Sequence, residues 1–349
     1  MYTLLKSPTY KKLLNETAAH NINWDELAGK CVLVTGATGG IGSFLIDLIN
    51  HRNLMYSNNI NIVAISRDKS RLQERFCNYK NISIIARDIT KEVDFNIKCD
   101  YIIHAASNTH PIQYASKPID TITANVHGTH NLLELTARNK NCRIIFLSSV
   151  EIYGQNRGDV DKFAEDYCGY IDPNTLRAGY PESKRTGEAL CQAYVAEKKV
   201  DAVILRLSRV YGPTTAADDS KAISQFIKNA MNCEDIVLKS NGEQLYSYAF
   251  IADTAIALLH VMLNGVTGEA YNMSSENSDV TLKELAEKLA KTVGVKIVFN
   301  LPKAEESKGY STATKAVLNT EKLRNIGWKS RYDISSGLEL TTKILSECK

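Results

Sequence analysis

The sequence predicts an α/β fold in which a doubly wound parallel sheet is followed by a smaller C-terminal lobe. Short apolar runs alternate with helical patterns through the first two-thirds of the chain, and such alternation is typical of a parallel sheet. The runs are apolar at consecutive residues, which indicates strands that are covered on both faces. The alternation loosens after Val210, so we expect the second lobe to begin near this residue.

Apolar runs mark the expected strands of the sheet. They cover residues 31–35, 61–66, 81–86, 101–106, 143–149 and 201–208. Helical patterns lie between several of these runs, and the clearest cover residues 41–49, 125–139 and 183–198. Further helices are expected at 221–233, 253–263 and 281–294, and Thr281 is the expected N-terminal cap of the last one.

The composition excludes several classes of protein. The chain has 349 residues, of which 44% are hydrophobic and 23% charged, as in ordinary globular proteins. Its 42 Lys and Arg against 39 Asp and Glu give a net charge of +3 without a basic block, so we expect neither nucleic acid nor a membrane surface as a partner. No apolar run approaches the ~20 residues of a membrane-spanning helix, and the start lacks the apolar stretch of a signal peptide.

The eight cysteines are scattered, and none lies within four residues of another. This spacing contains no CxxC motif for zinc or redox chemistry. His127 and His130 are three residues apart, but no third ligand lies near them, so we expect no metal. Single cysteines in a chain without a signal peptide indicate reduced thiols and a cytoplasmic protein.

A glycine-rich turn follows the first expected strand. The segment VLVTGATGGIG places Gly36, Gly39 and Gly42 between this strand and a helix. Glycines permit the tight turn and let the backbone approach a pyrophosphate, whose charge then lies at the helix N-terminus. We therefore expect a Rossmann-type dinucleotide site. The turn residues that would contact the cofactor are Gly36, Thr38, Gly39, Gly40, Ile41 and Gly42.

The end of the second expected strand distinguishes NAD from NADP. A carboxylate there accepts hydrogen bonds from the adenosine ribose, whereas a cation holds a 2′-phosphate. The strand ends at Ser66, and Arg67 and Asp68 follow. Arg67 is placed to bind a phosphate, so the sequence favours NADP(H). NAD(H) is the alternative if a loop shift brings Asp68 to the ribose, and a solvated turn of mixed charges is a second alternative.

Tyr180 and Lys184 stand four residues apart in the segment YPESK. This spacing places the phenol and the ammonium on one face of a helix. A nearby cation favours phenolate and lowers the pKa of the tyrosine, which can then exchange a proton with a sugar hydroxyl or carbonyl. Ser149, at the end of the fifth expected strand, adds a hydroxyl that can bind the same oxygen.

With these motifs in order, the chain resembles the extended short-chain dehydrogenase/reductase superfamily, the group of NAD-dependent epimerases and dehydratases that act on nucleotide sugars. The matching segments are TGATGGIG, IIHAAS, NVHGT, FLSSVEIYG, YPESK, LRLSRVYGP and YNMSS, and they extend over about residues 30–349. The resemblance implies that Ser149, Tyr180 and Lys184 are the catalytic set. It also implies hydride exchange with a nicotinamide beside the sugar, and a homodimer that pairs helices within 112–138 and 180–198.

The resemblance implies further site residues and a division of the chain into domains. Further cofactor contacts are expected at Asp88, Ile89, Ala105, Ala106, Ser107, Asn125 and Lys184. Asn108 is expected at the substrate, although Ser107 and Asn108 would also suit a turn. Residues 1–28 form an added helical extension without assigned chemistry. Residues 29–208, with about 250–272, form the expected dinucleotide-binding domain, and residues 209–249 and 273–349 form the expected substrate-binding lobe.

Departures from the family pattern narrow the reaction. Dehydratases of the group carry an Asp-Glu pair after the catalytic Ser or Thr, whereas this chain has Val150 and Glu151. Decarboxylases acting on nucleotide-linked glucuronic acid use an Arg where this chain has Tyr246. Arg209 replaces the usual Asn of its motif and can supply a cation to the substrate, with pairing to a local carboxylate as the alternative. Arg206 of the same motif is expected to be structural.

The sequence favours NADPH-dependent reduction of a nucleotide-linked ketose or sugar carbonyl, as in the reductases that make CDP-alditols. An NAD-dependent nucleotide-sugar epimerase is the alternative, and dehydration and decarboxylation fit less well. Glu151 is expected to act as a base or to bind substrate, with a simple ion pair as the alternative. A catalytically idle protein that senses NADP(H) is a further alternative, although such proteins usually lose the Tyr or Lys that this chain keeps.

Overall fold

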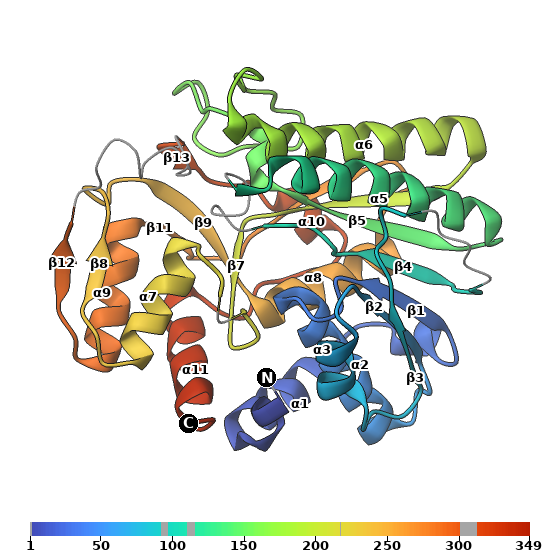
Figure 1. Cartoon of the computed structure of the whole chain (residues 1–349), viewed down its shortest axis with the longest axis horizontal. Helices are drawn as coiled ribbons and strands as arrows, with labels where there is room; N and C mark the ends of the chain where they lie inside the picture. The colour runs from blue at the N-terminus through green and yellow to red at the C-terminus, as the bar shows by residue number, and fades with distance from the viewer. Residues whose placement is uncertain (1, 92–96, 110–115, 217, 301–312) are drawn as a thin grey trace.

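A seven-stranded sheet forms the centre of the computed structural model, which describes residues 2–91, 97–109, 116–216, 218–300 and 313–349 (Figure 1). Within these residues the strand order is β10-β6-β5-β4-β1-β2-β3, and every neighbouring pair is parallel. The strands are β1 Cys31–Thr35, β2 Asn61–Ser66, β3 Ile82–Ala86, β4 Tyr101–His104, β5 Arg143–Ser149, β6 Asp201–Leu207 and β10 Ala270–Met273. The predicted doubly wound parallel sheet is therefore confirmed.

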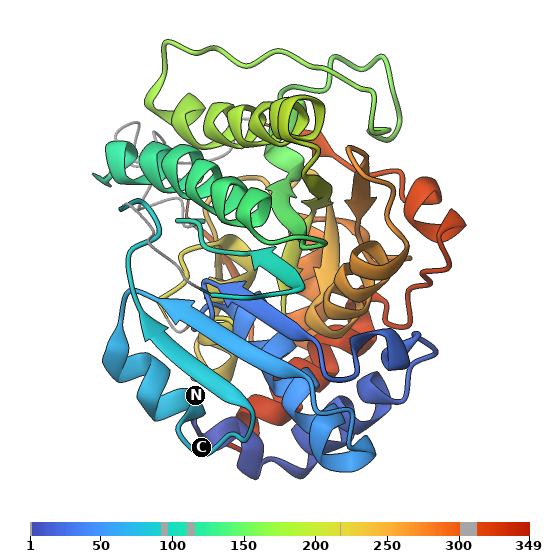
Figure 2. The same cartoon turned by 90° about the vertical axis from the view of Figure 1, so that its right-hand side faces the viewer.

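Helices cover both faces of this sheet. Side by side on one face lie α5 (Pro118–Arg138) and α6 (Gly179–Lys198), as Figure 2 shows. The opposite face packs against α2 (Gly40–Tyr56), α3 (Lys69–Phe76) and α8 (Ile251–Asn264). Alternate strand residues supply two separate apolar cores, one for each face. Burial on both faces explains why the strands are apolar at consecutive residues.

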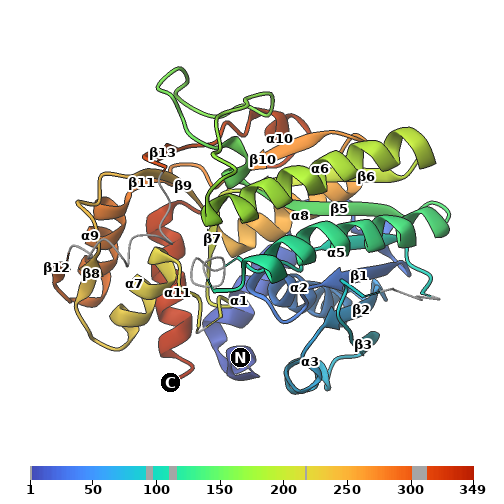
Figure 3. The ribbon, with the colours of Figure 1, turned by 45° about the horizontal axis from the view of Figure 1, so that its top comes forward.

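A smaller group of elements lies beside the carboxyl ends of the strands, on the left in Figures 1 and 3. Its central strand β9 pairs in parallel with β7 and β13 and antiparallel with β11. Its strands are β7 Arg209–Tyr211, β8 Ile236–Leu238, β9 Leu245–Phe250, β11 Asp279–Thr281, β12 Ile297–Phe299 and β13 Lys315–Ala316. Its helices are α7 Ala222–Met231, α9 Leu282–Val293 and α11 Ile334–Ser346, and α10 Glu321–Asn325 lies near β10. Thr281 caps α9, as predicted.

Two helices begin earlier than the sequence pattern predicts. The helix expected from residue 125 begins at Pro118, and the one expected from residue 183 begins at Gly179. Pro118 and Pro181 both lie in a first turn, where the missing N–H of proline would have no helical partner. Tyr180 therefore lies inside the helix. The fourth strand ends at His104, two residues earlier than expected, because the chain turns there and the Ala105 N–H donates to the Ile103 carbonyl.

The N-terminal extension contains α1 (Pro8–Ala18), which a buried polar cluster fastens to the sheet domain. The Tyr10 hydroxyl donates to Asp47 of α2 at 2.6 Å, and the Tyr79 hydroxyl donates to the other carboxylate oxygen at 2.6 Å. Arg75 forms an ion pair with the same carboxylate, and both side chains are buried. A buried charge requires such partners, so Asp47 joins α1, α2 and α3.

The same helix also contacts the last helix of the chain. Glu347 accepts hydrogen bonds from the Ser7 and Thr9 hydroxyls, each at 2.5 Å, and from the Thr9 N–H at 3.1 Å. Its pKa lies below the usual value, because the Ser7 and Thr9 hydroxyls stabilise the charged carboxylate. The N-terminal helix thus bridges the sheet domain and the smaller lobe.

Replacing Asp47 by Ala should destabilise the protein strongly. Arg75 would keep a buried charge without its partner, which costs about 3–5 kcal/mol of unfolding free energy. Urea denaturation measures this loss. The matched control is Lys12→Ala, because the Lys12 side chain is 76% exposed and its loss should change stability by less than about 0.5 kcal/mol. Equal effects of the two substitutions would show that the cluster does not stabilise the fold.

Candidate active site

The glycine turn between β1 and α2 brings backbone unusually close to the end of β4. Gly36 has a φ of +65°, and a Cβ there would lie 2.7 Å from the Ala105 carbonyl oxygen. A Cβ on Gly42 would lie 2.4 Å from the Gly36 carbonyl oxygen. Gly39 is the N-cap of α2 and has no side chain to cap it, so the first amides of the helix donate no hydrogen bond to a capping side chain. These features fit a dinucleotide, because its pyrophosphate needs close backbone and a helix N-terminus.

No carboxylate is directed from the end of β2 toward a ribose. The Ser66 and Thr38 hydroxyls lie 3.0 Å apart, and Arg67 is exposed. Asp68 is the N-terminal cap of α3, where it accepts the Arg71 N–H at 3.0 Å. Asp68 points along its own helix because its side chain caps the first turn. The segment at the end of β2 therefore provides no carboxylate at the position where one would bind the adenosine ribose and favour NAD.

Asp88 lies beyond the end of β3, near Arg67. It accepts the Thr90 N–H and the Thr90 hydroxyl, each at 2.9 Å. Partial burial acts to raise the pKa of Asp88, but the Thr90 hydrogen bonds and the Arg67 charge outweigh it and hold this pKa below its usual value. Asp88 is therefore a charged, locally bonded carboxylate at the margin of the expected cofactor site.

Lys184 carries its ammonium into the interior, one turn along α6 from Tyr180. Its Nζ donates to the Leu147 carbonyl at 2.7 Å and lies 6.0 Å from the centre of the Tyr180 ring. Burial lowers the pKa of Lys184 to about 7, although Glu188 acts in the opposite direction. The helix pattern therefore places the phenol and the ammonium on one face, as the i, i+4 spacing predicts.

Ser149 ends β5 and caps a short 3-10 helix, Val150–Tyr153. Its hydroxyl oxygen accepts the Glu151 N–H at 3.3 Å. Leu147, which holds Lys184, lies two residues before Ser149 on the same strand. The end of one strand therefore supplies both the anchor of the lysine and the serine hydroxyl, and it brings Ser149, Tyr180 and Lys184 to one cleft.

Two arginines contact Glu151 in this cleft. Arg177 donates to the carboxylate at 2.7 Å, and an Arg209 nitrogen lies 3.8 Å from it. The Arg209 guanidinium carbon lies 3.4 Å from the centre of the Tyr246 ring, in a stacked cation–π arrangement. The buried Nη1 of Arg209 has no hydrogen-bond partner among the described residues. Arg209 thus contacts both a local carboxylate and the tyrosine that replaces the family arginine.

The cleft has a volume of about 1320 Å³, which exceeds the ~300–1,000 Å³ of a typical small-molecule site. Its lining includes most of the site residues predicted from the sequence. These are Gly36, Gly39, Gly40, Ile41, Gly42, Ala105, Ser107, Ser149, Glu151, Tyr180, Lys184, Arg209 and Tyr246. The volume is sufficient for a dinucleotide together with a second ligand.

Other predicted residues do not line the cleft. They are Thr38, Ser66, Arg67, Asp88, Ile89, Ala106, Asn108 and Asn125. Ile89 is buried against Gly128, and Asn125 is buried in α5, where it donates to the Ser183 hydroxyl at 2.9 Å. Arg177 and Lys221 also line the cleft and were not predicted, because neither belongs to a recognisable motif. Arg177 lies in the short 3-10 helix Leu176–Ala178, and Lys221 directly precedes α7.

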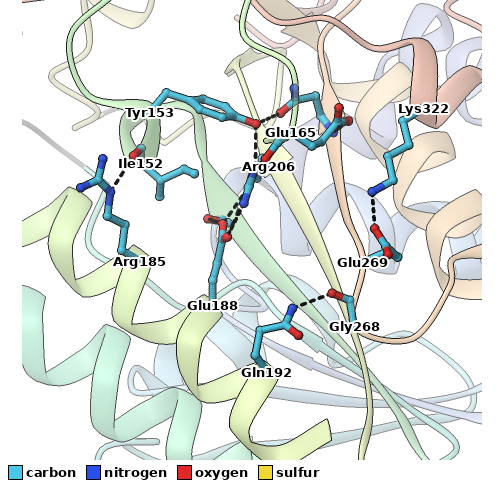
Figure 4. A network of polar contacts seen from close by, with 12 residues as sticks. Ile152, Tyr153, Glu165, Arg185, Glu188, Gln192, Arg206, Gly268, Glu269 and Lys322 are labelled. Carbon is cyan, nitrogen blue, oxygen red and sulfur yellow. Dashed lines mark hydrogen bonds and ion pairs between the residues drawn. The ribbon is translucent and has the colours of Figure 1, made fainter. Parts of the chain in front are cut away.

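Arg206 is part of a structural network outside the cleft. Figure 4 shows its guanidinium between Glu188 and Tyr153. It forms an ion pair with Glu188 at 2.7 Å and donates to the Tyr153 hydroxyl at 2.8 Å. These contacts connect β6 to α6 and to the segment after β5. The expected structural role of Arg206 is confirmed.

Neither a metal site nor a membrane span is found in the described part of the chain. Its His, Cys, Asp and Glu side chains form no group of three or more that could hold a metal ion. His130 instead lies 2.9 Å from the Tyr194 hydroxyl. Each described helix is too short or too polar to cross a bilayer.

Comparison with known proteins identifies the family. The model of the NAD dependent epimerase/dehydratase family matches residues 32–274. The chain belongs to this family. The match covers the glycine turn, Ser149 and the Tyr180–Lys184 pair, so the chain is an enzyme of the NAD dependent epimerase/dehydratase family, and the resemblance to extended short-chain dehydrogenases/reductases is confirmed.

Several curated relatives of this family member are named as decarboxylases. It is 30% identical to "UDP-glucuronic acid decarboxylase 6" of Arabidopsis thaliana, with 88% of this chain and 87% of the relative covered. It is 28% identical to "UDP-glucuronic acid decarboxylase 1" of Xenopus tropicalis, with 89% and 71% covered.

Solved structures of epimerases share the fold. A UDP-glucose 4-epimerase of Thermotoga maritima superposes with a TM-score of 0.77 at 21% identity, over 90% of this chain and 98% of that one. A UDP-glucuronic acid 4-epimerase of Bacillus cereus, solved with UDP-glucuronic acid and NAD, has a TM-score of 0.76 at 20% identity, over 91% and 99%.

The buried ammonium of Lys184 should make stability depend on pH. Folding lowers its pKa from 10.5 to about 7, so between these values the unfolded chain holds a proton that the folded chain has released. The contribution of Lys184 to stability therefore rises with pH across this window. From pH 7 to 9, wild type should gain about 2 kcal/mol relative to Lys184→Met.

Urea denaturation at both pH values measures this difference. The exposed Lys291 supplies the control, because Lys291→Met should remain parallel to wild type at every pH. A Lys184→Met curve that is also parallel to wild type would show that the ammonium is not destabilised by burial.

Proposed function

We propose that this enzyme exchanges hydride between a nicotinamide dinucleotide and a carbon of a nucleotide-linked sugar. The observation that supports this is the meeting of the glycine turn with Ser149, Tyr180 and Lys184 in one cleft. The cleft volume also suits two ligands, and we assign the second to the smaller lobe. The nucleotide sugars in the names of the similar proteins, UDP-glucuronic acid and UDP-glucose, agree with this assignment.

Tyr180 would transfer the proton, and Lys184 and Ser149 would assist this transfer. Nicotinamide, when bound, supplies or accepts the hydride. The Tyr180 phenol gives its proton to the carbonyl oxygen during reduction, and the Tyr180 phenolate takes the proton of the alcohol during oxidation. Lys184, fastened to the Leu147 carbonyl, favours the phenolate. The Ser149 hydroxyl donates a hydrogen bond to the same substrate oxygen and stabilises the charge that develops there.

We propose NADP(H) as the preferred cofactor. Asp68 is occupied as a helix cap, while Arg67 is exposed beside the expected 2′ position of the ribose. A guanidinium there binds a 2′-phosphate through charge-assisted hydrogen bonds. Relatives solved with NAD, such as the dTDP-glucose 4,6-dehydratase of Bacillus anthracis, make NAD(H) the alternative.

Net reduction of a nucleotide-linked ketose or sugar carbonyl by NADPH is the direction that this cofactor choice favours. Dehydration fits less well, because Val150 occupies the place of the general acid. Epimerisation needs the same three side chains and a cofactor that stays bound through an oxidation and a reduction. Cofactor consumption therefore distinguishes the two.

Decarboxylation of a nucleotide-linked uronic acid is the second candidate, and the position of Arg209 favours it. Position 246 carries a tyrosine where the decarboxylases use an arginine. Arg209 stacks on Tyr246, and its Nη1 has no hydrogen-bond partner in the part of the chain that the structure describes, so a neighbouring strand supplies a cation to the same place. Oxidation beside the carbon that carries the carboxylate would give a β-keto acid, which loses carbon dioxide, and the electron pair of the broken bond takes up a proton.

A screen of nucleotide sugars with NADPH and with NAD separates these reactions. Reduction should consume one NADPH per product, measured at the nicotinamide absorbance band. Epimerisation should give product without net cofactor change, and decarboxylation should release carbon dioxide from nucleotide-linked glucuronic acid. Tyr180→Phe should lower turnover on the order of 100-fold and keep NADPH binding. The control is Tyr170→Phe, because Tyr170 is 52% exposed; full activity of Tyr180→Phe would refute the proposed role.

Arg67→Ala tests the cofactor choice. Loss of one charge-assisted contact to the 2′-phosphate should weaken NADPH binding about tenfold and leave NADH binding unchanged, as measured by fluorescence titration. Arg138, exposed at the far end of α5, provides the control variant Arg138→Ala. Tighter binding of NADH than of NADPH by wild type would establish NAD(H) instead.

A further inference from the structure

A buried line of hydrogen bonds runs beneath the cleft, between the glycine turn and the helix that carries Tyr180. His104, at the end of β4, is 1% exposed. Its Nδ1 lies 3.1 Å from the Thr35 hydroxyl at the end of β1, and its Nε2 lies 3.1 Å from the Thr129 hydroxyl of α5. One imidazole therefore connects two strands and a helix.

The neighbouring contacts determine the direction of each hydrogen bond. The Thr129 hydroxyl donates to the Asn125 carbonyl. The Thr129 oxygen must therefore accept the hydrogen bond from His104, whose Nε2 carries the hydrogen. His104 Nδ1 is then an acceptor and receives a hydrogen bond from the Thr35 hydroxyl. The Thr35 oxygen in turn accepts a hydrogen bond from the Ala106 N–H at 3.2 Å. This describes a neutral imidazole with one donor and one acceptor edge. Burial, with the charge of Lys184, lowers the pKa of His104 to about 3, so this form persists at neutral pH.

The line continues to the catalytic helix. The Asn125 amide donates to the Ser183 hydroxyl at 2.9 Å, and this hydroxyl donates to the Tyr180 carbonyl at 2.8 Å. Packing also connects His104 to Lys184 through Phe146. The His104 and Phe146 ring centres are 5.6 Å apart, and Lys184 Nζ lies 4.8 Å from the centre of the Phe146 ring. His104 thus lies behind both Tyr180 and Lys184.

We propose that His104 is a positioning residue that fixes the first turn of α6, and with it Tyr180, relative to the glycine turn. This proposal rests on the proposed function only in taking Tyr180 as the group that handles the proton. An apolar ring at position 104 would leave the Thr35 and Thr129 hydroxyls without these partners in a dry core. No other side chain of this size offers a donor and an acceptor on opposite edges.

Two measurements that need no substrate test this role. The first is the ring resonance of Tyr180 in protein labelled with ¹³C-tyrosine, assigned by its absence in Tyr180→Phe. The second is amide hydrogen exchange in residues 179–187. His104→Phe and Thr129→Val should each move the Tyr180 resonance and speed exchange in this segment about tenfold, while exchange in α9 stays as in wild type. Thr129→Val keeps the side-chain shape, so it provides the test if His104→Phe does not fold.

The control is His260→Phe. His260 is also buried, at 6% exposed, but it lies on α8 outside this line of hydrogen bonds, and its ring packs against His20 with the two ring centres 6.1 Å apart. This variant should leave the Tyr180 resonance and the exchange in α6 unchanged. Ser183→Ala should move the Tyr180 resonance as well, and His104→Phe added to it should move the resonance little further.

Wild-type behaviour of both His104→Phe and Thr129→Val would overturn the proposal, and so would equal effects of His260→Phe. Since neither measurement involves turnover, such a result would leave the proposed function intact. Conversely, failure of the nucleotide-sugar screen would leave the positioning role of His104 intact.

Discussion

The hydrogen bond from the Lys184 ammonium to the Leu147 carbonyl is the contact around which the site is arranged. An amine buried to this extent needs an acceptor, and the end of a central parallel strand provides one in a fixed place. This contact joins α6 to β5, so that Ser149, two residues along the strand, lines the same cleft as Tyr180, four residues back along the helix. The end of a strand and the first turns of a helix therefore position these side chains.

Much of this arrangement could be predicted from local sequence. The continuous apolar runs indicated the inner strands, because strands buried on both faces cannot alternate. The glycine turn and the Tyr180–Lys184 pair were recognisable because their chemistry requires fixed spacing along one strand-to-helix turn or one helix face. Thr281 was also predicted as the cap of its helix, and the structure adds the reciprocal contact from Glu284 that completes a capping box.

Features that depend on distant pairing could not be predicted. Glu151 meets Arg177 and Arg209, which are 26 and 58 residues away in the chain, and no spacing rule connects them. His104 lies inside the strand expected over 101–106, and only the fold brings Thr35 and Thr129 to its two edges. The helical pattern of α6 becomes clear only from residue 183, and its first turn could be predicted from the Tyr180–Lys184 spacing and from Pro181, a residue suited to a helix start.

The contact between α1 and Glu347 has a consequence for the order in which the chain assembles. Ser7 and Glu347 are separated by 340 positions, and both chain ends lie at the same corner of the molecule (Figure 1). α1 therefore cannot complete its contacts until α11 has also been synthesised. Closing so long a loop is slow relative to forming local contacts, so α1 and α11 should join the structure together, late in folding.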